Sequence, residues 1–171
     1  AFHLANLPSG CPEGFAACLG LAANRVGWTE KWDGRGRPRA GRYRSGIGLS
    51  CTYGADAHAV FAEVMVDIEM GTVMLSAIAV AQVIGAADDE LVIRRALEQD
   101  LIHRIGHTFG QGGRHVRLPT AMDVPESDFV FARSTAVTHA RPALASFSAA
   151  VANAVRDAAG KQLINRVLAA G

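Results

Sequence analysis

The alternation of apolar and polar residues over 57–68 constrains the fold of this chain more than any other feature. Phe61, Glu63, Met65 and Asp67 occupy one parity. The other parity is apolar from residue 60 on, at Val60, Ala62, Val64, Val66 and Ile68. A period of two is typical of a β-strand with one buried face. A short turn at 69–72 and a second apolar run at 73–80 follow, so the segment predicts a β-hairpin.

Helical spacing marks three further segments. Apolar residues recur from Phe15 to Val26 and stop at Gly27, and a second helix is expected from Asp88 to about His107, with acidic residues in its first turn. A third helix is expected at 143–159, after Pro142. Short strands are expected at 47–53, 118–120 and 129–132. The 171 residues therefore predict a single domain, residues 1–171, of the α+β class, with an antiparallel or mixed sheet packed against helices.

Composition excludes several classes of protein. Hydrophobic residues make up 50% of the chain and charged residues 19%, which permits a core and argues against general disorder. The formal net charge of +1 gives no global reason to expect nucleic acid or a membrane surface as partner. The chain has neither an apolar run of bilayer length nor a secretory leader, so we expect a cytoplasmic protein. Because it begins at Ala1 without a methionine, we expect some N-terminal sequence to be missing.

The three cysteines and a basic stretch are interpreted as structural. The cysteines are odd in number and form no Cys-x-x-Cys pair, which favours free buried thiols in a reducing compartment: Cys11, Cys18 and Cys51. Residues 31–45 carry arginines at nearly every second position and are interrupted by Gly and Pro, so we expect an exposed basic loop. Its Trp32 and Tyr43 among arginines permit contact with phosphate or single-stranded nucleic acid, although a solvated charged surface is the favoured interpretation.

Two histidines on the second predicted helix suggest a metal site, but the surrounding sequence does not support one. His103 and His107 lie four residues apart, on one helix face, and His115 follows. Arg104 stands where a zinc protease motif has its glutamate, and its charge would oppose a cation. We therefore expect no metal and interpret the pair as a half-buried helix face with hydrogen-bonded histidines.

A longer pattern is more specific than any of these features. It comprises Tyr53-Gly54, the run 62–67, Gly71-Thr72-Val73, Leu97-Glu98, Gly106, the run Leu118-Pro119-Thr120-Ala121-Met122-Asp123-Val124-Pro125, Pro142, Ala150, Asn153-Ala154, Asp157-Ala158 and Gly160-Lys161. In this order the pattern resembles the C-terminal molybdopterin-binding region of the aldehyde oxidase and xanthine dehydrogenase large subunit. The upstream run 25–28 also fits the segment before that region. The resemblance covers most of this chain and only the last part of a large subunit.

The resemblance implies a chemistry whose key positions have changed in this chain. The family hydroxylates aldehydes and N-heterocycles at a molybdenum centre, with a glutamate as general base. That glutamate falls on Arg141, and the glutamine that holds the pterin falls on Arg95. Two family glycines fall on Gln99 and Asp100, and 82–87 replaces an Asp-Gly-Asn-Pro stretch. Since arginine is not deprotonated at working pH and larger side chains close the backbone approach, we expect no hydroxylation by this chain alone. We also expect no cofactor unless a partner chain completes a molybdopterin cradle.

Three functions follow from these observations. The first is a stand-alone relative whose former cofactor pocket binds a polar or anionic small molecule and catalyses metal-free acid–base chemistry of the isomerase or cyclase type. The candidate residues are Arg95, Glu98 and Arg141 for ligand binding and His103, His107 and His139 for proton transfer. The second is a molybdopterin-binding subunit of a split molybdenum hydroxylase that needs a partner chain. The third is a non-catalytic module that uses the basic loop. A homodimer or a partner subunit is expected in either of the first two cases.

Overall fold

The hairpin predicted from the alternation is present and forms the centre of a four-stranded sheet. The computed structural model describes residues 7, 9, 11, 14–32, 40–53, 57–109, 124–142 and 144–159. The strands are β1 (Tyr43–Thr52), β2 (His58–Asp67), β3 (Val73–Gly85) and β4 (Glu126–Ser134), in the spatial order β1-β2-β3-β4. The first three strands pair antiparallel, whereas β4 runs parallel to β3. The sheet is therefore mixed.

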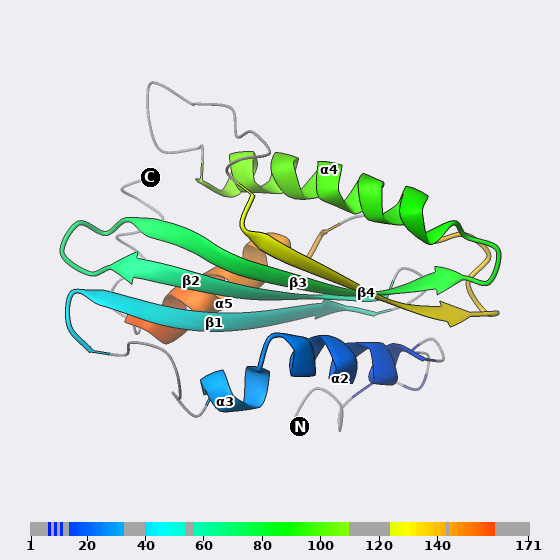
Figure 1. Ribbon diagram of the computed structural model, residues 1–171, viewed down its shortest axis with the longest axis horizontal. Helices are drawn as coiled ribbons and strands as arrows, with labels where there is room; N and C mark the ends of the chain where they lie inside the picture. The colour runs from blue at the N-terminus through cyan, green and yellow to red at the C-terminus, as the bar shows by residue number, and fades with distance from the viewer. Residues whose placement is uncertain are drawn as a thin grey trace.

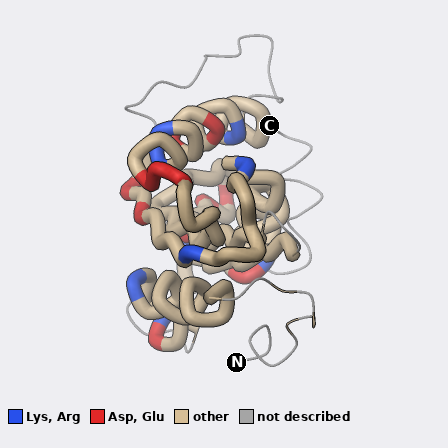
Figure 2. Tube along the Cα trace, turned by 90° about the vertical axis from the view of Figure 1, so that its right-hand side faces the viewer, with Lys and Arg blue, Asp and Glu red and all other residues tan. Residues whose placement is uncertain are grey.

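Helices cover both faces of this sheet. They are α2 (Phe15–Arg25), α3 (Trp28–Trp32), α4 (Glu90–Phe109) and α5 (Phe147–Ala159). In Figure 1, α2 and α3 lie along one side of the sheet and α4 along the other, with α5 behind β1 and β2. The view turned by 90° shows the same layers, with the sheet between the helices (Figure 2). Within the described residues, no helix is both long enough and apolar enough to cross a membrane.

The alternation of β2 and β3 divides the core into two clusters. Val60, Val64 and Val80 face α4 and α5, together with the buried helix residues Leu97 and Leu101. Phe61, Ala79 and Val83 point to the opposite face, where Phe15 and Leu19 of α2 cover them. Both faces of the central strands are thus buried, which explains why these strands are apolar on both parities toward the middle of the sheet.

Helix α5 lies unusually close to the edge strand β1. Gly46 and Gly48 face it, and a Cβ atom at either position would overlap the helix backbone at Ala154. The same helix also binds the open edge of β1. The Asp157 carboxylate accepts the N–H of Ile47 at 3.0 Å, and the Asn153 amide donates to the carbonyl of Leu49 at 3.0 Å. These two contacts cover backbone groups that an edge strand otherwise exposes.

Several bounds differ from those expected from the sequence. The strands at 47–53 and 129–132 are longer than expected, and the expected loop 31–45 contributes its last residues to β1 and its first to α3. The last helix begins at Phe147 rather than at 143, because Leu144 is held by a contact with α4. The β3–β4 pair is parallel because the 20-residue helix α4 carries the chain back across the sheet. The expected strand at 118–120 and the position His115 lie outside the described residues.

Candidate functional site

The chain between β4 and α5 passes the end of β3 and the first half of α4. Three polar side chains hold it there. We call residues 135–142 and 144–146 the crossing segment. Each of the three side chains forms a hydrogen bond with the backbone of this segment. Asp88 and Asp100 accept a backbone N–H, and Gln82 donates to a backbone carbonyl. The segment contains two of the residues selected from the sequence, His139 and Arg141.

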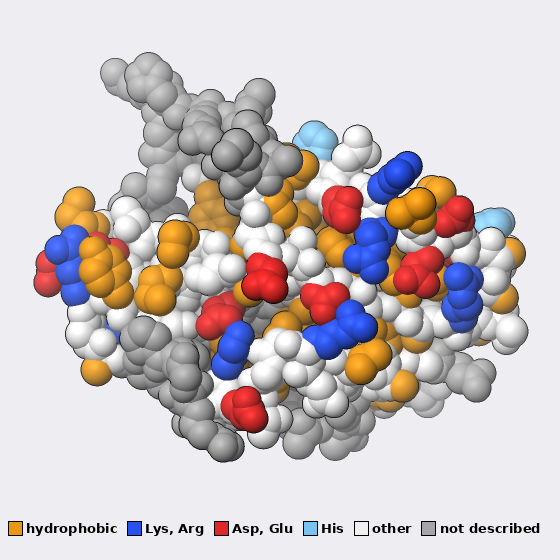
Figure 3. All heavy atoms as spheres, viewed as in Figure 1, with side chains coloured by type: hydrophobic (Ala, Val, Ile, Leu, Met, Phe, Trp, Pro, Cys, Tyr) orange, Lys and Arg blue, Asp and Glu red, His pale blue; other side chains and the backbone are white. Residues whose placement is uncertain are grey.

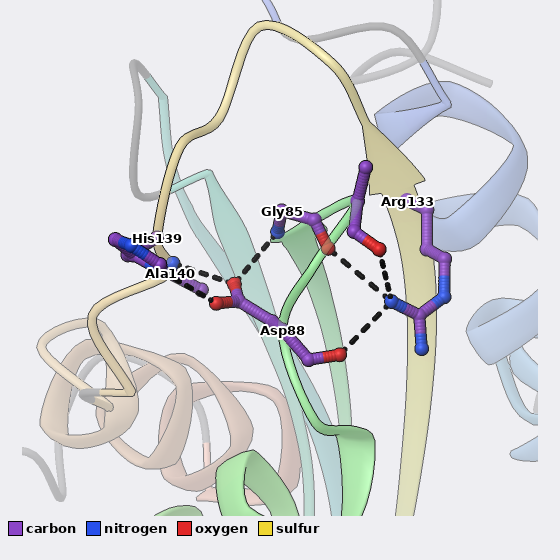
Figure 4. A network of polar contacts seen from close by, with 6 residues as sticks. Gly85, Asp88, Arg133, His139 and Ala140 are labelled. Carbon is purple, nitrogen blue, oxygen red and sulfur yellow. Dashed lines mark hydrogen bonds and ion pairs between the residues drawn. The ribbon is translucent and has the colours of Figure 1, made fainter.

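Asp88 is the centre of the first contact (Figure 4). One carboxylate oxygen accepts the N–H groups of Gly85 at 2.7 Å and Ala140 at 2.8 Å, and the other lies 3.1 Å from His139 Nδ1. These partners, the Ala140 amide first, lower the pKa of Asp88 below its ordinary value. Arg133 of β4 donates to the carbonyls of Gly85, Ala86 and Asp88 on the other side of the same turn. The network fixes the turn between β3 and α4 and the start of the crossing segment.

Gln82 makes the second contact from inside the core. It is fully buried on the α5-facing side of β3, and its Nε2 donates to the carbonyl of Arg141 at 3.2 Å. Its Oε1 is also buried and has no hydrogen-bond partner among the described residues, and the same holds for the hydroxyl of Ser146. His58 is directly opposite Gln82 in the β2–β3 register and is 2% exposed. Polar groups therefore gather in an otherwise apolar interior.

The register places Ser146 over this end of the sheet. Helix α5 runs antiparallel to β1, since Gly46 approaches Ala154 and Ala158, whereas Gly48 approaches Ala150. Ser146 lies one helical turn before Ala150, toward the end of β1 where Thr52 pairs with His58. Ser146, His58 and Gln82 thus lie at the same end of the α5-facing side of the sheet. We call these three residues the buried polar cluster.

Asp100 makes the third contact, from α4. Its carboxylate accepts the N–H of Leu144 at 2.7 Å and lies 3.3 Å from Arg104, one turn further along the helix. Leu144 itself is fully buried between α4 and α5, in the same cluster as Leu97 and Leu101. The face of α4 next to the crossing segment is therefore occupied by protein.

The six site residues selected from the sequence are all exposed, four of them on α4 and two on the crossing segment. Arg95, Glu98, His103 and His107 lie on α4, where Arg95 and His107 are about 18 Å apart along the helix axis. His139 is near the first turn of α4, with 78% of its side chain exposed, and the Arg141 side chain makes no hydrogen bond or ion pair with any described residue. The histidines of α4 are exposed rather than half-buried, and the described residues contain no metal-binding cluster of His, Cys, Asp or Glu.

Sequence reasoning missed the residues that hold this region together. It selected Arg95, whereas the neighbouring Arg94 packs over the rings of Phe129 and Phe131 and donates to the Phe129 carbonyl. Gln82 carried a usable signal, because a glutamine inside the apolar run 73–85 is a polar residue where a core position is expected. The contacts of Asp88 and Asp100 with the crossing segment gave no local signal, since Ala140 and Leu144 are more than 40 residues away in the chain.

The described part of the basic stretch is largely neutralised by carboxylates. Arg42 binds Asp67 at 2.7 Å and Glu69 at 3.3 Å, and Lys31 lies 2.6 Å from Glu63. The space-filling view shows acidic and basic side chains interspersed across the face that it presents (Figure 3). Residues 33–39 lie outside the described part of the chain, so the expected basic loop is described only at its two ends.

Comparison with known proteins yields structural neighbours but no sequence relative. No family model and no curated protein matches the chain. Aldehyde oxidoreductase from Desulfovibrio desulfuricans ATCC 27774 matches 68% of this chain with a TM-score of 0.56 at 16% identity. Aldehyde oxidoreductase from Desulfovibrio gigas matches the same share with a TM-score of 0.52 at 16% identity. CO dehydrogenase from Oligotropha carboxidovorans matches 60% with a TM-score of 0.51 at 18% identity.

These neighbours establish a fold. They are molybdenum hydroxylases, the class of enzyme that the sequence resembles, and the matched segment is 15% or 16% of each of their chains. The domain thus has the α+β fold of one segment of such an enzyme. The assignment of that segment to the C-terminal end of a large subunit stays a prediction.

Proposed function

We propose that this chain is a relative of the molybdenum hydroxylases that carries no molybdopterin and binds a small polar molecule at the buried polar cluster, beneath the crossing segment. The proposal keeps the first function expected from the sequence and moves its site. The exposed residues Arg95, Glu98, His103 and His107 are not part of the cluster. Arg141 stays beside it, through its backbone contact with Gln82.

The residues present do not fit molybdopterin. In the family that the sequence resembles, glycines on the α4 helix leave room for the planar pterin, and here Asp100 fills one such position and binds Leu144. The general base of that family falls on Arg141, which cannot accept a proton at working pH. A cofactor of that size would have to displace Leu144, which is 0% exposed. We therefore derive no step through a molybdenum centre.

The observation that carries the proposal is the pair of buried polar atoms without a protein partner. A buried acceptor or hydroxyl that lacks a hydrogen bond destabilises the fold by about 1–3 kcal/mol, so native proteins retain very few of them. Gln82 Oε1 and Ser146 Oγ are two such atoms at one end of the sheet. A small polar molecule that bonds to both would remove this cost, and its binding energy would stabilise the domain.

The test is to identify what the purified chain carries. Released small molecules are measured by mass spectrometry after denaturation, for the wild type and for Gln82→Met, which keeps the volume and removes the amide. A polar molecule at near one equivalent, lost in Gln82→Met and retained in the control Arg156→Ala on the exposed side of α5, is the expected result. Equal amounts in all three proteins would contradict the proposal.

A second function is favoured by a different observation. Leu91 and Val92, at the start of α4, are 54% and 61% exposed, and the matched segment is a small share of each neighbour's chain. A partner chain seated there would make this protein one part of a split enzyme, the second function expected from the sequence. Molybdenum and pterin in a complex with a second chain, and neither in the isolated chain, would support this function over the first.

A further inference from the structure

We infer that the ligand of the buried polar cluster is a small hydroxy- or amino-carboxylate, whose hydroxyl or amino group donates to Gln82 Oε1 and whose carboxylate lies at the N-terminus of α5, next to Ser146. The inference rests on the proposed function and names the chemical class of its ligand. It depends on three features: the fixed orientation of Gln82, the start of α5 and the distribution of charge around them.

The orientation of the Gln82 amide defines the first ligand group. Its Nε2 donates to the Arg141 carbonyl at 3.2 Å, so a flipped amide would place two acceptor oxygens against each other. The buried Oε1 atom is therefore an acceptor and needs a donor from the ligand. An ionised carboxylate has no hydrogen to donate to this atom, whereas a hydroxyl or an ammonium group has one.

The start of α5 defines the second ligand group. Ser146 occupies the position immediately before the helix, where a serine hydroxyl commonly accepts an N–H of the first turn. Here that hydroxyl is buried without a hydrogen bond, so it does not cap the helix. The first-turn N–H groups of a 13-residue helix carry partial positive charge, and the hydroxyl can donate beside them. Together they favour an anionic oxygen.

The surrounding charges are compatible with a single negative charge on the ligand. The two carboxylates that hold the crossing segment are already engaged, Asp88 with the amides of Gly85 and Ala140, and Asp100 with Arg104 and the amide of Leu144. Arg141 is exposed on the crossing segment, and its backbone carbonyl accepts the hydrogen bond from Gln82. A positive charge on the segment that covers the cluster favours an anionic ligand.

The experiment compares three probes of similar size by isothermal titration calorimetry on the full chain. Glycolate offers a hydroxyl and a carboxylate, acetate only the carboxylate, and ethylene glycol only hydroxyls. We expect glycolate to bind about tenfold more tightly than acetate, the effect of one hydrogen bond, and ethylene glycol to bind more weakly than both. Gln82→Met should remove the difference between glycolate and acetate. Ser146→Ala should weaken both carboxylates, and Arg156→Ala should change neither.

The outcomes separate this inference from the proposed function. If none of the carboxylates binds but a neutral polar molecule is released from the purified chain, the ligand class is wrong and the proposed function stands. If glycolate binds equally to wild type, Gln82→Met and Ser146→Ala, it binds elsewhere, and the inference fails. If nothing binds, nothing is released, and a crystal structure shows only water at Gln82, both fail. Far-ultraviolet circular dichroism confirms that each variant is folded before titration.

Discussion

Asp100 and Leu144 are joined by a hydrogen bond of 2.7 Å from the Leu144 amide to the Asp100 carboxylate, across 44 residues of sequence. This bond attaches the segment before α5 to the middle of α4 and holds the fully buried Leu144 side chain against Leu97 and Leu101. The bond thus makes this part of α4 a packed interface with the crossing segment.

Asp100→Ala should lower the free energy of unfolding by about 1–3 kcal/mol, because the buried end of the crossing segment loses a charged hydrogen-bond acceptor. The measurement is urea denaturation followed by circular dichroism. Glu98→Ala, at an exposed position on the same helix, is the matched control and should change the stability by less than about 0.5 kcal/mol. Equal effects of the two substitutions would show that the Asp100 contact does not stabilise the fold.

Gly48→Ala should destabilise the protein by about 3 kcal/mol, since the added Cβ would overlap the α5 backbone at Ala150 and Ala154. Gly20→Ala is the control, because its Cβ meets no atom within 4 Å and lies in helix α2. It should stabilise the protein by about 0.5–1 kcal/mol through helix propensity. The melting temperatures of the two variants should therefore move in opposite directions. A neutral Gly48→Ala would contradict the close approach of α5 to β1.

Acid should weaken the fold through Asp67. The hydrogen bond from the Arg42 guanidinium is the main cause that lowers the pKa of Asp67 from 3.8 to about 2; burial opposes it, and the amides of Met70 and Glu69 add to the lowering. A carboxyl with a lowered folded-state pKa stabilises the protein above its unfolded pKa and loses that contribution as pH falls toward 2. Asp67→Asn should therefore reduce the fall in melting temperature between pH 4 and 2. Glu98→Gln should keep the wild-type slope.

The thiols should react slowly in the folded protein. Burial raises the pKa of both Cys18 and Cys51 to about 11, and the Cys18 thiol also contacts the Val130 carbonyl at 3.1 Å. The thiolate, which is the reactive form, is then about 100-fold scarcer at neutral pH than for a thiol of pKa 9. Labelling of these two cysteines by iodoacetamide should accelerate at least 100-fold on unfolding in urea. Rapid labelling of the native chain would indicate an activated cysteine.

Periodicity predicted the elements that are governed by local sequence. The β2–β3 hairpin, the helix after Asp88 and the helix before Gly27 were all expected close to their observed positions, because each buries a regular face. The three cysteines are free, as expected, but of the three only Cys18 is buried, whereas Cys11 and Cys51 are partly exposed. The parallel pairing of β4 was not specified, since it depends on the path of α4 rather than on the pattern within β4.

The site was harder to predict because it, too, depends on contacts between residues that are distant in the sequence. The helical spacing of His103 and His107 selects residues that can face one point, and on α4 that point is solvent. The contacts that shape the region join residues 44 to 59 positions apart, such as Gln82 with Arg141 and Asp88 with Ala140. The glutamine within the apolar strand β3 was a usable signal, but the sequence analysis did not select it.

Native mass spectrometry of the purified full chain, with molybdenum analysis of the same sample, distinguishes a small polar ligand from molybdopterin. The protein is produced in a host that synthesises molybdopterin, so that the cofactor is available. We expect a chain that carries a small polar adduct and neither molybdenum nor a pterin mass, because Leu144 and Asp100 close the face of α4. A stoichiometric pterin mass with molybdenum on the isolated chain would contradict it.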